Sequence, residues 1–200
     1  GEPVKNHIRN LAMLKLIYNY GGVIIQNSFI CFKSIKPIHN LIKKYNRPFC
    51  GEFLSQGINN FNNVEDIFKP SIKFIGSMKN CDTIKSVIDS YEAIINKDCT
   101  NEMDFRGALE NILYNHLINN NITTVPGEYI GTKTKNHKLL TVDKLLGNEK
   151  LNLSNRCYLL YVDDDTISKM NKFNWLLSMD IYELLKTDNN LSKCLIKVNS

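Results

Sequence analysis

A pair of glycines followed by three polar residues is the first stretch of the sequence whose residue types could do chemistry. Gly21 and Gly22 precede a short β-branched run, and that run is followed by Gln26, Asn27 and Ser28. In an α/β sheet ligands bind where strands end, glycine lets a ligand approach the backbone, and neutral amides and hydroxyls can hydrogen-bond a polar ligand. We therefore take this stretch as a candidate binding site. The alternative is that the glycines only end a helix and the polar residues face water.

Three consecutive aspartates form the second candidate. Asp163, Asp164 and Asp165 follow an apolar run, residues 157–162, that is typical of a strand. Because side chains alternate along an extended chain, Asp163 and Asp165 could point the same way, and their carboxylates could bind Mn²⁺ or Mg²⁺. The sequence thus offers a divalent-metal site at Asp163 and Asp165. The alternative is helix capping, because acidic residues favour a helix N-terminus.

The other titratable residues show no catalytic spacing. The histidines stand far apart, so each is interpreted as a surface or packing residue. Glu102 and Asp104 could supply a catalytic acid or begin a helix, and the pattern favours the helix start. The sequence contains neither a G-x-S-x-G serine motif nor a phosphate loop ending in Gly-Lys-Ser/Thr. The four histidines are His7, His39, His116 and His137.

Alternating helical and extended patterns must position these candidates. The first segment predicts a helix with a broad apolar face, made by Ile8, Leu11, Ala12, Leu14, Leu16 and Ile17. The glycine pair ends it, and the β-branched run that follows predicts a fully buried strand. The elements expected in this half are helix 4–20, strand 23–25, extended chain 29–32, helix 37–44, strand 47–53, loop 54–69, and strand 71–75 ended by Gly76.

The second half continues the alternation. It predicts helices over 83–96 and 104–119, strands over 122–125, 139–142 and 157–162, and a closing amphipathic helix over 173–186. Alternating strands and helices favour an α/β fold with a mainly parallel sheet flanked by helices. No linker divides the pattern, so we expect a single domain over residues 1–200.

Two stretches of the first half resemble a known family. Residues 14–25, which read Leu-Lys-Leu-Ile-Tyr-Asn-Tyr-Gly-Gly-Val-Ile-Ile, are similar to the sugar-binding region of glycosyltransferases of family thirty-two. Residues 74–80, Phe-Ile-Gly-Ser-Met-Lys-Asn, resemble the strand and turn that follow that region. The resemblance implies a GT-A fold, either whole or without its N-terminal part, a nucleotide-sugar donor, and a hydroxyl acceptor on a sugar or a protein. In the family a pair of aspartates holds a divalent metal on the donor's diphosphate.

The chain departs from that family pattern where metal is bound. Gln26 and Ser28 stand at the positions of the two aspartates, Asn10 at the position of a helix aspartate, and Met13 at that of an arginine. A pair of unit charges about 4 Å apart is worth roughly 4 kcal/mol at an effective dielectric near 20, so neutral side chains bind a divalent ion much less well. The substrate-binding candidates are Asn10, Tyr20, Gly21, Gly22, Gln26, Asn27 and Ser28.

Two functions of different classes follow from this departure. One is a glycosyltransferase-like enzyme whose active site is degenerate; Asp163 and Asp165 are then the only clustered carboxylates for Mn²⁺ or Mg²⁺. The other is a scaffold of the same fold that has lost its chemistry and acts as a binding or structural protein. The Asn-, Lys- and Ile-rich composition also suggests an AT-rich genome, such as that of a large DNA virus.

Composition limits the partners and the compartment. The 200 residues carry a net charge of +5 from lysines and arginines that are scattered along the sequence, which argues against a nucleic-acid partner. No apolar run is long enough to span a membrane. The cysteines show no C-x-x-C pair, so we expect a reducing, cytoplasmic compartment, or a virion if the protein is viral. Buried, inert thiols are expected at Cys31, Cys50, Cys157 and Cys194.

Overall fold

The fold is a mixed α/β arrangement of two compact units. The computed structural model describes residues 2–54, 68–97 and 107–199. The first unit comprises Gly1–Gln26 and Lys36–Val125, and the second comprises Asn27–Ile35 and Pro126–Ser200. The chain therefore leaves the first unit after β1, contributes a short segment to the second, and returns. The expectation of a single domain over 1–200 stays a prediction.

A four-stranded sheet organises the first unit. Its strand order is β1 (Gly22–Ile25), β4 (Phe68–Ser77), β3 (Phe49–Leu54) and β5 (Thr123–Val125). β1 and β3 both run antiparallel to β4, and only β5 is parallel to its neighbour β3. The expected mainly parallel sheet is therefore wrong. Alternating helices and strands do not fix strand direction, because a pair is parallel only when a crossover returns the chain to the same end of the sheet.

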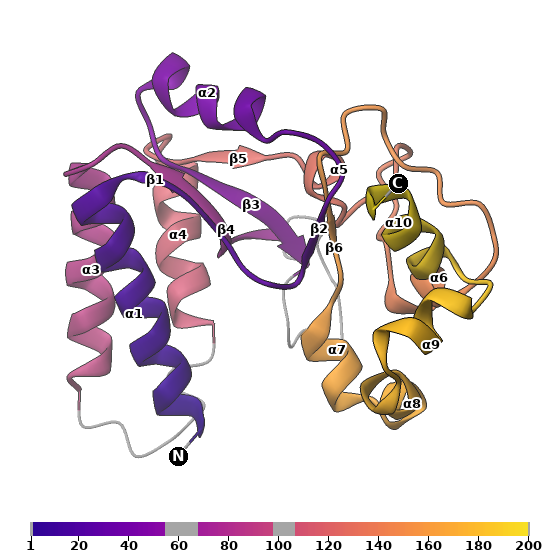
Figure 1. The fold of residues 1–200 in the computed structure, drawn as a ribbon. Helices are drawn as coiled ribbons and strands as arrows, with labels where there is room; N and C mark the ends of the chain where they lie inside the picture. Colours follow the sequence, from indigo (N-terminus) through magenta and orange to yellow (C-terminus); the bar gives the residue numbers. More distant parts are fainter. Residues whose placement is uncertain (1, 55–67, 98–106, 200) are drawn as a thin grey trace. The chain divides into compact units, whose positions relative to one another are not determined.

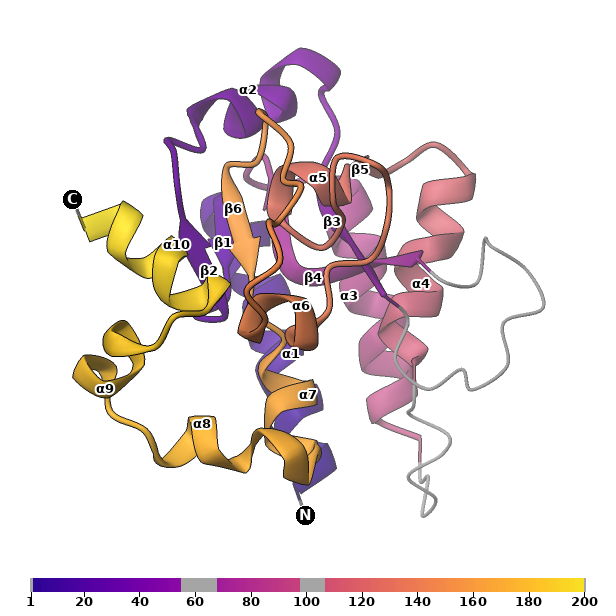
Figure 2. The same cartoon turned by 90° about the vertical axis from the view of Figure 1, so that its right-hand side faces the viewer.

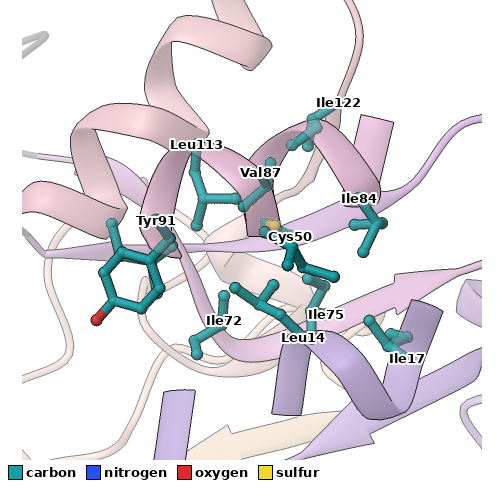
Figure 3. Packing of buried hydrophobic residues seen from close by; sticks show 12 residues of the cluster. Leu14, Ile17, Cys50, Ile72, Ile75, Ile84, Val87, Tyr91, Leu113 and Ile122 are labelled. Carbon is teal, nitrogen blue, oxygen red and sulfur yellow. The ribbon is translucent and has the colours of Figure 1, made fainter. Parts of the chain in front are cut away.

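Helices cover both faces of this sheet. α1 (Glu2–Tyr20), α3 (Asp82–Ile95) and α4 (Ala108–Ile118) lie side by side on one face, and α2 (Lys36–Tyr45) lies on the other (Figure 1). The main core forms where the three helices meet the sheet, and Figure 3 shows the Tyr91 ring in it with its hydroxyl at the edge. The fully buried members of this core include Leu14, Ile17, Cys50, Ile75, Ile84, Val87, Tyr91 and Leu113.

The apolar face expected for the first helix is too broad. Leu14 and Ile17 are buried, but Leu16 is 53% exposed and Ile8 is 56% exposed. A helix that packs on one side buries only about one stripe of its surface, so residues two apart cannot both face the core. The strand after the glycines is also half-buried rather than fully buried, because β1 lies at the edge of its sheet.

Gly76 continues a strand that it was expected to end. It lies inside β4 opposite Phe49, and an added Cβ there would come within 2.3 Å of the Phe49 ring. The Phe49 ring also packs against Phe74, with 5.4 Å between ring centroids. Glycine is therefore needed at this position to admit an aromatic ring from the neighbouring strand.

A two-stranded antiparallel pair organises the second unit. β2 (Phe29–Cys31) pairs with β6 (Leu159–Tyr161), with Phe29 opposite Tyr161. α10 (Asn190–Asn199) packs against β2, and α5 (Gly127–Ile130) packs against β6 (Figure 2). The other elements are α6 (Val142–Leu146), α7 (Asp164–Lys169), a 3-10 turn (Asn171–Phe173), α8 (Asn174–Ser178) and α9 (Ile181–Lys186).

Two elements expected in this unit are wrong. Residues 139–142 form no strand beyond one isolated bridge between Lys133 and Leu139, and Val142 already begins α6. The helix expected over 173–186 is broken, because Asp180 caps α9 through a capping box with Glu183. Within the described part of the chain, no helix is long and apolar enough to cross a membrane.

The thiols divide into buried and exposed groups. Cys50 and Cys157 are buried as expected, Cys194 is partly buried, and Cys31 is exposed, contrary to expectation. The apolar neighbours of Cys31 in the sequence misled the prediction, because alternate residues of a strand point to opposite sides. Cys99, together with the expected loop over 54–69, Glu102 and Asp104, falls largely or wholly outside the described residues.

The buried thiols predict a loss of stability in alkali. Burial raises the pKa of Cys50 to about 12 and that of Cys157 to about 11, from 9.0. As the pH rises, the unfolded chain therefore loses these protons at a lower pH than the folded chain does. The free energy of unfolding is unaffected below about pH 9 and falls from there toward the folded-state pKa values. The fall is at most about 1.4 kcal/mol per pH unit for each thiol. Urea unfolding at about pH 8 and about pH 10.5 measures this slope. Cys50→Ala should flatten it and Cys31→Ala should not; equal slopes in both variants would contradict the assignment.

Candidate functional site

The glycine pair makes a turn with two successive positive φ angles, which favour glycine. α1 ends at Tyr20, the Gly21 amide donates to the Ile17 carbonyl over 2.8 Å, and Gly21 has φ +67°. An added Cβ on Gly21 would lie 2.7 Å from the backbone nitrogen of Lys79. Gly22 has φ +96° but open space around the position of its missing Cβ. Glycine is therefore required at position 21 by both the close contact and the positive φ, and at position 22 by the positive φ alone.

The two stretches that carry the family resemblance lie against each other. β1 pairs with the C-terminal end of β4, with Gly22 opposite Ser77 and Ile25 opposite Phe74. Beyond the strands, the Asn80 amide donates to the Tyr18 carbonyl over 2.7 Å. The turn after α1 and the turn after β4 are thus one interlocked backbone structure.

The polar residues after β1 lie at the end of the strand, as the sequence predicts. The Gln26 amide donates to the Lys73 carbonyl over 3.1 Å, which extends the pairing with β4 by one residue. Asn27 is exposed at a turn, and Ser28 is half-buried. In the second unit the Ser28 carbonyl accepts from the Val162 amide over 2.8 Å, which places Ser28 beside the residue that precedes the acidic triplet. The two stretches that the sequence presented as separate candidates are therefore neighbours at Ser28 and Val162.

The remaining substrate-binding candidates on α1 have different surroundings. Tyr20 is 78% exposed and stands next to the glycine turn. Asn10 is half-buried and hydrogen-bonds the Tyr91 hydroxyl, which His7 also contacts over 2.5 Å. Burial raises the pKa of Tyr91 to about 12 in spite of the bond from Asn10, so the hydroxyl stays protonated at neutral pH. Asn10 therefore has a structural partner that accounts for its polarity.

The acidic triplet begins a helix. Asp163 is the N-cap of α7: it accepts from the Thr166 amide at 3.1 Å and from the Thr166 hydroxyl at 2.6 Å, and the Tyr161 hydroxyl lies 3.4 Å away. Both carboxylate oxygens are thus engaged locally. Asp164 is exposed in the first turn, and the side chain of Asp165 falls outside the described part of the chain. The helix-capping alternative is confirmed for Asp163.

The donors that the structure describes do not fit the divalent metal that the family resemblance implies. At the tip of β1, Gln26 and Ser28 offer only neutral oxygens, and Asp163 is held by its capping bonds. Among the described residues, no three histidine, cysteine, aspartate or glutamate side chains gather as a metal-binding group. Mn²⁺ and Mg²⁺ favour anionic oxygen ligands, so the described donors make a poor clamp for either ion.

No protein-family model, curated protein or solved structure matches this chain. The resemblance to family thirty-two therefore rests on the residues of the two stretches and stays a prediction. In the structure the two stretches are in contact. Backbone hydrogen bonds join the glycine turn to the turn after β4, and the missing side chain at Gly21 leaves room for that contact. The ligand role of the candidate residues stays a prediction.

Substitution at Asp163 separates capping from metal binding. Asp163→Ala should cost about 1 kcal/mol of unfolding free energy, because the Thr166 amide loses its acceptor. Asp163→Asn should cost no more than roughly 0.5 kcal/mol, because asparagine caps about as well as aspartate. Urea unfolding of both variants, with and without Mn²⁺, measures the difference. A stabilisation by Mn²⁺ that only the wild type shows would contradict a purely capping role.

One pair of functional groups was missed by sequence reasoning. The carboxylate of Glu128, which is buried in α5, contacts Nδ1 of His137, which lies on an exposed turn with φ +58°. The sequence interpretation treated His137 as a surface or packing residue. No regular helical or strand spacing connects the two residues, so no local signal could have found the pair.

Proposed function

We propose that the chain is a glycosyltransferase-like protein that binds a nucleotide sugar at the end of β1 and transfers the sugar to an acceptor hydroxyl. The observation that supports this most is the glycine turn. Gly21 packs closely against the backbone of Lys79, so the two stretches that resemble the family contact each other, and a side chain at Gly21 would disturb both. Glycine at position 21 therefore serves two purposes: it ends α1 and it allows the turn after β4 to approach.

The side chains around the turn suit a neutral, hydroxyl-rich ligand. Tyr20 presents an exposed ring beside two glycines, and Gly22 leaves open space at its Cβ position. Gln26, Asn27 and Ser28 offer amide and hydroxyl groups at the strand end, where bidentate hydrogen bonds to sugar hydroxyls can form. These residues would therefore bind the sugar or the ribose of the donor, and no step requires a metal.

A second function has its own supporting observation. The positions at which the family resemblance implies carboxylates carry Gln26 and Ser28, and Asp163 is occupied as a helix cap. A domain with this donor set could bind a saccharide without activating it, and would then act as a binding or structural protein. The two functions share the binding step and differ in catalysis.

Thermal unfolding with nucleotide sugars tests the binding step. A donor present at a hundred times its dissociation constant adds about 2.7 kcal/mol, which for a chain of this size raises the melting temperature by roughly 5–10 °C. Asn27→Ala should reduce this shift, whereas Asn40→Ala, an exposed amide on α2, should not. If no common nucleotide sugar shifts the transition, with or without Mn²⁺, the proposal fails.

Product analysis then separates the two functions. A protein that binds a donor should be incubated with it and with candidate hydroxyl acceptors, and the released nucleoside diphosphate measured. Release that depends on the acceptor supports the transferase. Binding without release in any of these mixtures supports the scaffold function.

A further inference from the structure

One part of the second unit has a high net positive charge. Residues 27–35 and 126–162 carry seven basic and three acidic side chains, so they hold a net charge of +4 out of +5 for the whole chain. We call these residues the basic region. The basic side chains are Lys33, Lys133, Lys135, Lys138, Lys144, Lys150 and Arg156.

Two of the three acids in the basic region are already paired. Glu128 is buried against His137, and Asp143 forms an ion pair with Lys172, at 2.8 Å. The negative charge of Glu128 is therefore largely withdrawn from the surface, and that of Asp143 is balanced by a cation from outside the basic region. Glu149 is the third acid. Basic side chains therefore outnumber acidic ones within the basic region, and Asp163, Asp164 and Asp165 follow it directly in the chain.

Hydrogen bonds link three of these basic residues, which come from three separate segments of the chain. Lys33 donates through its backbone to the Tyr158 carbonyl and through Nζ to the Asn155 carbonyl, over 2.6 Å. Arg156 follows Asn155 directly in the chain. The Lys135 amide donates to the Asn152 carbonyl over 2.7 Å. Lys33, Lys135 and Arg156 are all exposed, and all three are anchored to the stretch 152–158.

Two tyrosines lie among these cations. The rings of Tyr129 and Tyr158 meet edge to face with 6.0 Å between their centroids, and the Tyr129 hydroxyl accepts from Arg156 over 2.9 Å. Both tyrosines are half-buried. Rigid aromatic rings beside cations can pack against the apolar faces of sugar rings while the cations pair with acidic groups.

We infer that the basic region binds an acidic carbohydrate, with lysines pairing to its carboxylates and the tyrosines packing on its rings. Lysines outnumber the single arginine six to one. Proteins that read nucleic-acid bases rely on the bidentate geometry of arginine, whereas lysine acts as a point charge that suits any anionic polymer. If the protein is a transferase, this carbohydrate is its acceptor; that role rests on the proposed function, and the binding itself does not.

Binding of oligogalacturonate, a carboxylated sugar chain, tests this inference. Calorimetric titration should show binding that weakens roughly tenfold or more when salt is raised from about 50 to about 200 mM, because several ion pairs form at once. A neutral maltose oligomer of equal length should not bind. Lys33→Gln/Lys135→Gln/Arg156→Gln should weaken galacturonate binding about tenfold or more. The control Lys43→Gln/Lys44→Gln/Lys97→Gln removes the same charge from exposed positions of the first unit and should change it less than about twofold.

The outcomes distinguish the possible errors. Absence of galacturonate binding, equal loss in both triple variants, or tighter binding of poly(U) RNA at the same salt would each overturn the inference. The charge-preserving variant Lys33→Arg/Lys135→Arg should bind like the wild type, so it tests the role of charge even if the first triple variant unfolds. If the chain binds galacturonate but no nucleotide sugar, the inference that it binds an acidic carbohydrate holds. Only the role of that carbohydrate as a transferase acceptor is then excluded.

Discussion

A Gly21→Ala variant should lose about 3 kcal/mol of unfolding free energy and all nucleotide-sugar binding. The backbone at Gly21 has φ +67°, where a Cβ costs roughly 1–2 kcal/mol, and the new Cβ would also press on the Lys79 backbone from 2.7 Å. Backbone cannot rotate away as a flexible side chain can, so the turn after α1 or the turn after β4 must shift. Urea unfolding measures the first effect, and the thermal shift with a donor measures the second.

Gly22→Ala is the matched control for this prediction. The neighbouring glycine also has a positive φ, +96°, but nothing lies within 4 Å of its Cβ position. It should therefore lose only the conformational cost, about 1–2 kcal/mol. Equal losses in the two variants would mean that the contact between Gly21 and Lys79 is unimportant, and the main support for the proposed function would go with it.

The second large effect is expected at Leu14. This side chain is fully buried where α1 meets α3 and the sheet, so Leu14→Ala should cost about 3 kcal/mol through lost burial and the cavity it leaves. Leu16→Ala removes the same atoms two residues along the same helix, where the side chain is 53% exposed. It should cost less than roughly 0.5 kcal/mol, apart from any small effect on helix propensity.

The comparison of Leu14 with Leu16 tests the rotation of α1 about its axis. Because the helix leads directly into the glycine turn, its rotation sets where Tyr20 points. Denaturant unfolding of both variants gives the two free energies. Similar losses at both positions would show that the helix buries a wider face than the structure describes, as the sequence alone suggested.

Local features of the fold could be predicted from the sequence. The helix stop at Gly21, the strand after it, and the helices near 36–45 and 82–95 all follow from residue patterns that act over a few positions. Strand direction could not be predicted, since it depends on which strands pair. The break at Asp180 was missed because an apolar helical pattern continues across it, and the capping box overrides that pattern.

The candidate site was predictable to a similar extent. The position of Gln26, Asn27 and Ser28 at a strand end follows from local pattern, and capping by Asp163 was one of two stated alternatives. The contact of Ser28 with Val162, the pair of Glu128 with His137 and the clustering of cations around residues 152–158 were not predictable. Each joins residues brought together by chain folding, for which the sequence carries no spacing signal.

The pairing of β2 with β6 has a consequence for how the chain acquires its structure. The two strands are separated by about 130 residues, and a ribosome adding roughly ten residues per second needs on the order of ten seconds to deliver the second after the first. During that interval Phe29, Ile30 and Cys31 leave the exit tunnel with no partner strand. A truncation after Val125 would keep this unpaired strand permanently, so aggregation of such a fragment would reflect an orphaned strand rather than a defect in the first sheet.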